Sequence, residues 1–585
     1  MRKVSGRGGA GGRKRIEGVV PAPLTENVTV GTASGMTASG SNSYVWFVAN
    51  GARPGDILTA FDIAFLGAAT GQLWRAKVLP GGIVGEWIAK IADVTAAGAG
   101  IVPVTGFAPV ALGEGEMVAY KRLSGLQVAT TPGPAATSLT GPNGSFTGAG
   151  SSATLTANTN EIGIKLYLTR LVLSRSPVPL TFPRQITGIV GYGQSYILGQ
   201  AATPPLSTTP SAYDKTFGVG EKMTKSGLGA VATTDDGTIK ALVEDTSNPS
   251  LSGAGSYGET ILSAMCSEMG GRVLARTGVR PVFFGSVAGK GAQAIAALQP
   301  YADHYANSSY HIEAGKREAA DLGQTYGLAL VPVLHGQADQ QAGTTKDNYL
   351  VGIERYVDRT IYEARHFAPG APQPQFLFMT PGFAIKTSWG VTQALLELCE
   401  RRGDCHIVTH DTRLPIGADN THPTNVGQHL AGALFGRAGA ELTLGRRPSR
   451  IWWRTATVVG TTVTVVASAY TPVEFNTTLR ALTTDYGFKL LDDTGTLTLS
   501  GIAKVGSVFN TLTGLYDTTF TMTINRALGT NPRLRYALDY TAAGINMTGA
   551  ATGNVFDTNT DMVTISGTPT SMALEATPYE WALAA

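Results

Sequence analysis

The chain has 585 residues and a formal net charge of only +3, so its charge gives no argument for binding nucleic acid or an anionic membrane surface. Hydrophobic residues make up 43% of the chain, charged residues 15%, and 73 residues are glycine, a composition that suits β-rich domains with many turns. Because this length exceeds what one hydrophobic core usually serves, we expect about three domains.

The N-terminal segment, residues 1–24, begins as a basic, glycine-rich arm that no apolar segment of signal-peptide type follows. We interpret it as a flexible, solvated leader, and the alternative is an arm that orders against an acidic surface of a partner. No apolar run approaches the roughly 18 residues of a transmembrane helix. The three cysteines, Cys266, Cys399 and Cys405, are too few for a disulfide framework, which is compatible with folding in a reducing cytoplasm. We expect Cys399 and Cys405 to be buried free thiols, with a redox pair as the alternative.

Residues 25–180 consist of short apolar runs separated by Gly, Pro, Asn and Ser turns, a pattern that predicts a β-sandwich or jelly roll. Within this region, Thr130–Ala153 is rich in Gly, Pro, Ser and Thr and is typical of a long loop or a local disruption. The predicted strands are Tyr44–Val48, Ile57–Phe65, Leu73–Val78, Met117–Tyr120 and a closing strand within Glu161–Leu173.

In residues 183–440, short apolar strands alternate with segments of helical length, which predicts an α/β domain whose mainly parallel sheet is covered on both faces. The predicted strands are Ile186–Tyr192, Val279–Ser286, Ala329–Leu334, Gln375–Met379 and His406–Thr409. The predicted helices are Glu259–Thr277, His311–Tyr326, Tyr349–Phe367, Val391–Arg402 and Val426–Ala438.

Residues 446–585 return to a β pattern, and we expect a second β-sandwich there. Val and Thr alternate through Thr455–Ala467 around Gly460-Thr461, which indicates a hairpin. The pair Trp452-Trp453 opens this region. We interpret it as interdomain packing, with a sugar-stacking platform as the alternative.

Open α/β sheets bind ligands at the carboxyl ends of their strands, so reactive residues just after a predicted strand are the best candidates for a site. Ser195 follows the first strand within Gly191–Ser195, where glycines permit a sharp turn that exposes the hydroxyl. Asp419 and His422 have the spacing for an acid and an imidazole on one turn, and His335–Asp339 ends a third strand. Taken singly, each is equally typical of an ordinary turn, Asx turn or polar loop.

Taken together and in this order, the three segments resemble blocks of the SGNH (GDSL-like) hydrolases, in the branch of sialate O-acetylesterase-like and acetylxylan-esterase-like enzymes. The matching residues are G-Q-S at 193–195, H-G-Q-A-D at 335–339 and D-N-T-H-P-T at 419–424. A fourth segment, S-V-A-G-K-G at 286–291, resembles the block that lends a glycine N–H to the oxyanion hole. The resemblance covers residues 183–440 and implies a flavodoxin-like, three-layer fold.

By this resemblance Ser195 is the nucleophile, His422 the general base and Asp419 the residue that orients it. The backbone N–H groups of Ser195 and Gly289, with Gly291 as the alternative alignment, are implied for the oxyanion hole.

The resemblance also implies a side-chain oxyanion donor, which is Gln337 or, at the position where the family has Gln, His335. Gln194, Tyr196 and Asp339 are the implied substrate-binding residues, and residue 196 is Tyr where the family commonly has Asn. We expect no metal and no cofactor, since the histidines share no ligand spacing with cysteines or carboxylates.

The segments Tyr486–Phe488 and Arg526–Arg533 resemble β-sandwich modules that follow esterase domains in bacteriophage tail proteins. The expected function is therefore removal of O-acetyl groups from a bacterial surface polysaccharide by a tail fibre or spike component of a virion, made in the host cytoplasm. Its expected partners are that polysaccharide and other tail proteins. A homotrimer is compatible with a spike or fibre, and we expect neither nucleic-acid binding nor membrane insertion. The alternatives are an inactive glycan-binding or structural tail protein and a bacterial polysaccharide-modifying enzyme outside any virion.

Overall fold

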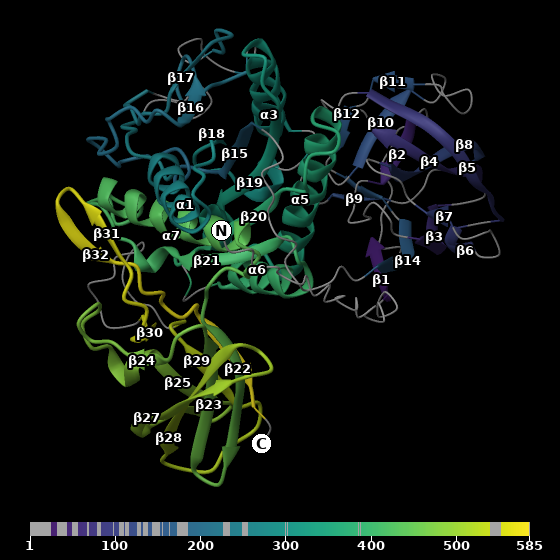
Figure 1. Ribbon diagram of the computed structural model, residues 1–585. Coiled ribbons are helices and arrows are strands. Elements are labelled where there is room, and N and C mark those ends of the chain that lie inside the picture. The colour runs from purple at the N-terminus through teal and green to yellow at the C-terminus, as the bar shows by residue number, and fades with distance from the viewer. Residues whose placement is uncertain are drawn as a thin grey trace, which may run out of the picture.

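The computed structural model describes the strands between residues 25 and 171, and residues 185–583 apart from gaps at 226–227, 229–233, 248–254, 299, 301, 384, 386–387 and 539–551. The basic arm, residues 1–24, lies outside the described residues. Figure 1 labels the elements along the chain.

The described N-terminal strands form two larger sheets and one strand pair, as a β region predicts, and their arrangement as a sandwich or jelly roll stays a prediction. The prediction of a loop or disruption over Thr130–Ala153 was wrong in part, because Ser138–Pro142 pairs with the predicted strand Tyr44–Val48. The first sheet has the order β1 (Thr25–Gly31), β14 (Ile164–Leu171), β3 (Ile57–Leu66) and β6 (Ala99–Val104), with β7 (Val110–Ala111) beside β3. The second has the order β11 (Ser152–Thr154), β5 (Val84–Ala96), β4 (Ala69–Val78), β8 (Glu116–Gly125), β2 (Tyr44–Val48), β10 (Ser138–Pro142) and β12 (Thr156–Asn158), and β13 (Asn160–Ile162) pairs with β9 (Thr130–Pro132).

The middle region is a mixed α/β unit around a mainly parallel sheet, as the alternation of strands and helices predicts. Its order is β17 (Ile239–Ala241), β16 (Asp214–Phe217), β18 (Phe283–Gly289), β15 (Ile186–Gly193), β19 (Tyr326–Leu334), β20 (Gln375–Thr380) and β21 (Cys405–His410). Only β17 pairs antiparallel. The five predicted strands take the doubly wound order 2-1-3-4-5, and β16 and β17 extend the sheet beyond them.

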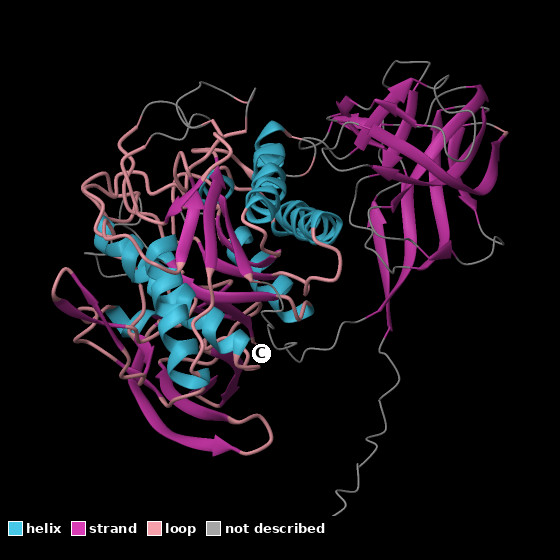
Figure 2. Ribbon diagram, turned by 45° about the horizontal axis from the view of Figure 1, so that its top comes forward, coloured by secondary structure: helices cyan, strands magenta, loops and turns pink. Residues whose placement is uncertain are grey.

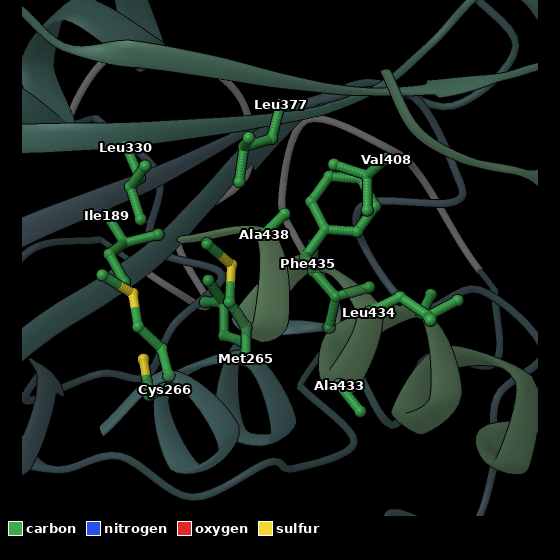
Figure 3. Packing of buried hydrophobic residues seen from close by; sticks show 14 of the residues in the cluster. Ile189, Met265, Cys266, Leu330, Leu377, Val408, Ala433, Leu434, Phe435 and Ala438 are labelled. Atoms are coloured by element: carbon green, nitrogen blue, oxygen red, sulfur yellow. The ribbon is translucent and has the colours of Figure 1, made fainter. Parts of the chain in front are cut away.

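Helices cover both faces of this sheet (Figure 2). One face packs against α1 (Leu262–Thr277) and α7 (Asn425–Thr443), and the other against α3 (Asp303–Asp321), α5 (Lys346–Phe367) and α6 (Gly390–Arg401). The strands supply both layers by alternation: Ile189 of β15 belongs to the first core, whereas Val190 and Tyr192 belong to the second. In Figure 3, strand residues such as Leu330 and Leu377 lie across from Met265 of α1 and Phe435 of α7.

Some predicted boundaries in this region were wrong. The strand predicted over Val279–Ser286 begins only at Phe283 and ends at Gly289. The helix predicted over His311–Tyr326 begins earlier, at Asp303, and ends at Asp321. Tyr326 is instead the first residue of β19, where its ring is buried against Gly188 and Gly315. The helices at α1, α5, α6 and α7 are confirmed within a few residues, and none of the described helices is both long and apolar enough to cross a membrane. All three cysteines are free and buried, as predicted for Cys399 and Cys405.

The C-terminal region is built of strands, and the predicted hairpin is confirmed by β22 (Trp452–Val459) and β23 (Thr462–Ala469), which turn at Gly460. Trp452 is buried among Arg447, Arg450 and Tyr470, and Trp453 packs against other aromatic rings of the same region. These contacts lie within residues 446–585, so a role of the pair in interdomain packing stays a prediction. These two strands form a sheet in the order β22, β23, β28 (Leu515–Ile524) and β27 (Leu499–Asn510). The other pairings are β24 (Val473–Phe475) with β30 (Val555–Asp557), the order β26 (Gly495–Leu497), β25 (Phe488–Asp492), β29 (Arg533–Tyr536) and β33 (Tyr579–Ala582), and β31 (Met562–Ile565) with β32 (Thr568–Ser571).

The β31–β32 hairpin packs on the α/β unit rather than on the other C-terminal strands. Ile565, Met572 and Leu574 belong to the same buried core as α1 and α7. Arg437 of α7 donates a 2.9 Å hydrogen bond to the Met572 carbonyl, and Arg272 of α1 forms a 2.9 Å ion pair with Asp561. A segment far along the chain therefore completes one hydrophobic layer of the central unit.

Candidate active site

Three of the sequence motifs, at 193–195, 286–291 and 335–339, lie side by side because the strands that carry or precede them end at the same level of the sheet. In the register of the sheet, Gly193 of β15 pairs with Gly289 of β18 on one side and with Leu334 of β19 on the other. Ser195, Gly291 and His335 thus follow three adjacent strand ends within two residues. This edge, at the carboxyl ends of parallel strands, is where open α/β sheets place their ligands.

The turn that carries Ser195 depends on glycine at its start. Gly193 has φ 153°, and a Cβ at this position would lie 2.1 Å from the Leu334 carbonyl oxygen, so no larger residue fits without a backbone shift. The chain then turns tightly, with the Gln200 N–H donating to the Ser195 carbonyl at 3.2 Å. The result is a nearly buried serine, 6% exposed, at the edge of the sheet.

Asp419 and His422 share one turn just before α7. The Asp419 Oδ1 atom accepts hydrogen bonds from the backbone N–H groups of Thr421 (3.0 Å) and His422 (2.9 Å), which is an Asx turn. Asn420, between them, has φ 54°, a left-handed conformation that Asn tolerates better than most residues. Thr424 then caps α7 by accepting from the Gly427 N–H at 3.1 Å.

A continuous series of hydrogen bonds links these residues. The His422 Nδ1 atom lies 2.6 Å from Asp419 Oδ2, and its Nε2 atom lies 2.8 Å from Ser195 Oγ. The partners assign the tautomer: Nδ1–H donates to the carboxylate and Nε2 accepts the hydroxyl proton. Partial burial by itself raises the pKa of Asp419, but hydrogen bonds from the His422 ring and two backbone N–H groups outweigh it and lower that pKa, so Asp419 is ionised at neutral pH.

Tyr196 lies behind this series and is fully buried. Its hydroxyl donates to the Thr421 carbonyl, and its ring packs against the His422 ring with centroids 5.6 Å apart. The Gln428 Nε2 atom of α7 donates to the Tyr196 carbonyl at 2.7 Å. The sequence suggested substrate contact for Tyr196, whereas its buried position connects the serine turn to the Asp-His turn. The departure from Asn at this position was the one signal that pointed to a different role.

The structure also locates the segment expected to supply backbone N–H groups. A Cβ on Gly289 would meet the Gly193 carbonyl oxygen at 2.9 Å, so Gly289 packs tightly against the first strand. A Cβ on Gly291 would lie 3.9 Å from the Ser195 Cβ and 3.7 Å from the Gln200 side-chain oxygen, so Gly291 faces the nucleophile. The geometry favours Gly291 over Gly289 as the residue beside the reacting centre. Gln194 is buried with no hydrogen-bond partner for its Oε1 atom among the described residues.

In the motif at 335–339, the His335 and Asp339 side chains form hydrogen bonds to neighbouring parts of the chain. His335 is buried, with Nδ1 3.0 Å from the Tyr349 hydroxyl and Nε2 3.1 Å from the Gln293 carbonyl, and burial lowers its pKa. Asp339, also buried, accepts from the Ile295 N–H at 2.7 Å at the start of α2 (Ile295–Leu298). Both side chains stabilise the loops around the site, and contact between substrate and Asp339 stays a prediction.

Gln337, the first residue of α4 (Gln337–Gln341), directs its amide nitrogen to Asp411 Oδ2 at 3.3 Å. Asp411, in the short helix η3 (Asp411–Arg413), is fully buried, and this burial raises its pKa to about 7 despite hydrogen bonds that lower it. Which side chain completes the oxyanion hole, Gln337 or His335, stays a prediction.

Within the part of the chain that the structure describes, no group of three or more His, Cys, Asp or Glu residues is arranged to hold a metal ion.

No protein-family model matches this chain, and no curated protein matches its sequence. Among solved structures, the chain aligns with a carbohydrate acetylesterase from Xanthomonas citri at 12% identity and a TM-score of 0.41, over 90% of this chain and 96% of that one. It aligns with a family two carbohydrate esterase from Clostridium thermocellum at 11% identity and a TM-score of 0.21, over 72% and 99% of the two chains. With an acetyl xylan esterase from the rumen bacterium Butyrivibrio proteoclasticus the values are 10% and 0.20, over 70% and 87%. These structural neighbours are carbohydrate esterases.

Proposed function

We propose that this protein is a serine carboxylic ester hydrolase that removes O-acetyl groups from a carbohydrate. The observation that carries the proposal is the hydrogen-bonded series Ser195–His422–Asp419, which places nucleophile, base and orienting carboxylate in the order that acyl transfer needs. Its place at the carboxyl ends of the parallel strands supports the same reading.

In the proposed reaction, Ser195 Oγ attacks the acetyl carbonyl carbon while its proton passes to His422 Nε2. The tetrahedral intermediate collapses, the sugar oxygen leaves with the proton from His422, and an acetyl-serine forms. Water then attacks this ester and gives its proton to His422, after which acetate leaves and Ser195 regains its hydrogen. Backbone N–H groups of Ser195 and Gly291 are the proposed oxyanion donors, each worth roughly 10²–10³ in rate.

For the substrate we propose an O-acetylated bacterial surface polysaccharide, and for the setting a bacteriophage tail fibre or spike. The support is the likeness of the motifs at 193–195, 335–339 and 419–424 to sialate O-acetylesterase-like enzymes, and of the C-terminal segments to tail modules. Other tail proteins are the proposed partners, a homotrimer the proposed assembly and the virion the proposed location.

The direct test is hydrolysis of 4-nitrophenyl acetate by purified wild-type protein beside Ser195→Ala and His422→Gln. His429→Gln is a matched control, because His429 also lies close to a carboxylate (3.2 Å from Glu259) but makes no hydrogen bond to Ser195. We expect activity in the wild type and the control, and none above background in the two site variants.

Acetate release from acetylated polysaccharide is measured in parallel. If the wild type leaves both the small ester and the polymers intact, the esterase proposal is wrong and the alternative of an inactive glycan-binding protein takes its place.

A further inference from the structure

The C-terminal region contains an open groove of about 440 Å³ that the proposed ester chemistry does not use. It lies between β27 and the loop that leads into the short helix η4 (Thr484–Gly487). Leu482 and Ile502 give it an apolar part, and Leu482 is 63% exposed. Its polar part consists mainly of hydroxyl groups and the carboxylate of Asp485.

The Asp485 carboxylate has no hydrogen-bond or ion-pair partner among the described residues. Its side chain is half-buried, and burial is the cause that raises its pKa. A partly desolvated carboxylate without donors gains from any ligand that supplies hydroxyl or N–H groups. Among the described residues that line the groove, Asp485 is the only acidic one, so these residues offer no cluster of carboxylates of the kind that a divalent cation requires.

Tyr486 places an aromatic ring next to this acceptor. The ring stacks on Phe475 with centroids 4.1 Å apart and an interplanar angle of 21°, which fixes its orientation, and Tyr486 lines the groove. An aromatic ring covers the C–H face of a sugar while neighbouring carboxylate and hydroxyl groups bond to the sugar hydroxyls, because a sugar ring is apolar on its faces and polar at its rim.

Both residues are held in place before any ligand binds. Asp485 (φ 52°) and Tyr486 (φ 54°) have left-handed backbone conformations that disfavour non-glycine residues, so the surrounding structure must hold them there. The buried Asn554 does so: its Oδ1 accepts from the Thr483 N–H (2.8 Å) and hydroxyl (2.7 Å), and its own N–H donates to the Tyr486 carbonyl at 3.1 Å. Strain of this kind, maintained at a groove, is typical of a binding site.

We propose that this groove binds a segment of a carbohydrate chain, with Tyr486 against a sugar ring and Asp485 accepting hydrogen bonds from its hydroxyls. This deepens the proposed function, on which it rests for the identity of the polymer: the enzyme acts on a polysaccharide that it holds at a second place. A single carboxylate beside an aromatic ring and hydroxyl groups favours a polyol over a basic peptide, which would be expected to meet several acidic groups.

The test is native affinity electrophoresis of the full chain carrying Ser195→Ala, so that binding is measured without hydrolysis. The gels contain acetylated xylan, acetylated gellan or, as a basic polymer, polylysine. We expect at least one polysaccharide to retard the protein, and Tyr486→Ala and Asp485→Asn each to weaken that retardation about tenfold, as for loss of one partly buried ring or charged hydrogen bond. Phe509→Ala is the matched control, because Phe509 is a 50% exposed aromatic residue on the same strand β27 but outside the groove.

Equal retardation of the Tyr486→Ala variant overturns the proposal, and so does retardation by polylysine alone. Absence of retardation by either polysaccharide overturns it as well. Asp485→Asn preserves the shape of the side chain. When this substitution is made in the protein that keeps Ser195, an unchanged melting temperature and an unchanged rate on 4-nitrophenyl acetate show that the variant folds. If the wild type lacks esterase activity while Tyr486-dependent retardation persists, the proposed function fails and the carbohydrate groove stands.

Discussion

Tyr196→Phe tests whether the contact behind the Ser-His-Asp series positions it. The substitution keeps the buried ring against His422 and removes only the hydroxyl that donates to the Thr421 carbonyl. Thr421 lies inside the turn that joins Asp419 to His422, so loss of this hydrogen bond frees the turn to shift relative to Ser195.

The magnitude follows from the geometry. A buried hydrogen bond contributes a net stabilisation of about 0.5–1.5 kcal/mol, so the free energy of unfolding falls by about that amount. If the same free energy holds the imidazole in place, kcat falls about two- to twelvefold, since 1.4 kcal/mol corresponds to a factor of about ten. KM for a small ester stays the same, because Tyr196 is fully buried and out of reach of the substrate.

Tyr192→Phe is the matched control. Tyr192 is equally buried and lies on β15 just before the serine turn, but its hydroxyl has no partner among the described residues. Removing an unpaired buried hydroxyl leaves stability unchanged or raises it by about 1 kcal/mol. The assays are kcat and KM on 4-nitrophenyl acetate and unfolding in urea. Wild-type kcat in Tyr196→Phe, or a stability equal to that of Tyr192→Phe, would refute the positioning role.

Three further predictions concern charged groups. Asp419→Asn removes the carboxylate that fixes the imidazole tautomer and lowers kcat by about 10²–10⁴-fold without a matching rise in KM, as steady-state kinetics would show. Burial raises the folded-state pKa of Asp411 to about 7, so between about pH 4 and 7 this carboxyl binds more protons in the folded than in the unfolded protein. The free energy of unfolding therefore falls as pH rises through that window. Asp411→Asn removes this contribution, and urea unfolding measured at several pH values would show a flatter profile there. Arg480→Ala strands the buried Glu575 without its ion-pair partner and costs about 3–5 kcal/mol of unfolding free energy, whereas Arg535→Ala, at a more exposed pair, costs about 1 kcal/mol or less; equal losses in the two variants would contradict this.

The features that the sequence predicted well are local. The apolar run Ile186–Tyr192 and the glycines around Ser195 depend on neighbouring residues, and so does the Asx turn that brings Asp419 close to His422. The sequence alone left Gly289 and Gly291 open. The preference for Gly291 follows from the register of the sheet, because the residue two positions past β18 lies level with Ser195.

Other features depend on contacts between distant segments and carry no local signal. The strand β16 has only four residues, Asp214–Phe217, and it exists because β18 offers an unpaired edge. The left-handed conformations of Asp485 and Tyr486 occur where local preference favours glycine, and they are stabilised by hydrogen bonds that join Asn554, about seventy residues away, to Thr483 and the Tyr486 carbonyl. Sequence pattern could not have identified the groove that these residues line.

The β31–β32 hairpin has a consequence for how the molecule is made. Ile565, Met572 and Leu574 complete a hydrophobic layer whose first member along the chain is Ile189. When synthesis of the α/β segment is finished, the chain therefore still lacks some side chains of that layer. Until residue 574 emerges, the parts of α1 and α7 that these side chains cover are open to water, so we expect the unit to reach its final stability only late in synthesis. A fragment cut after residue 445 would carry the Ser-His-Asp series on an incomplete core, so the borders of the reaction centre and of the stable folding unit do not coincide.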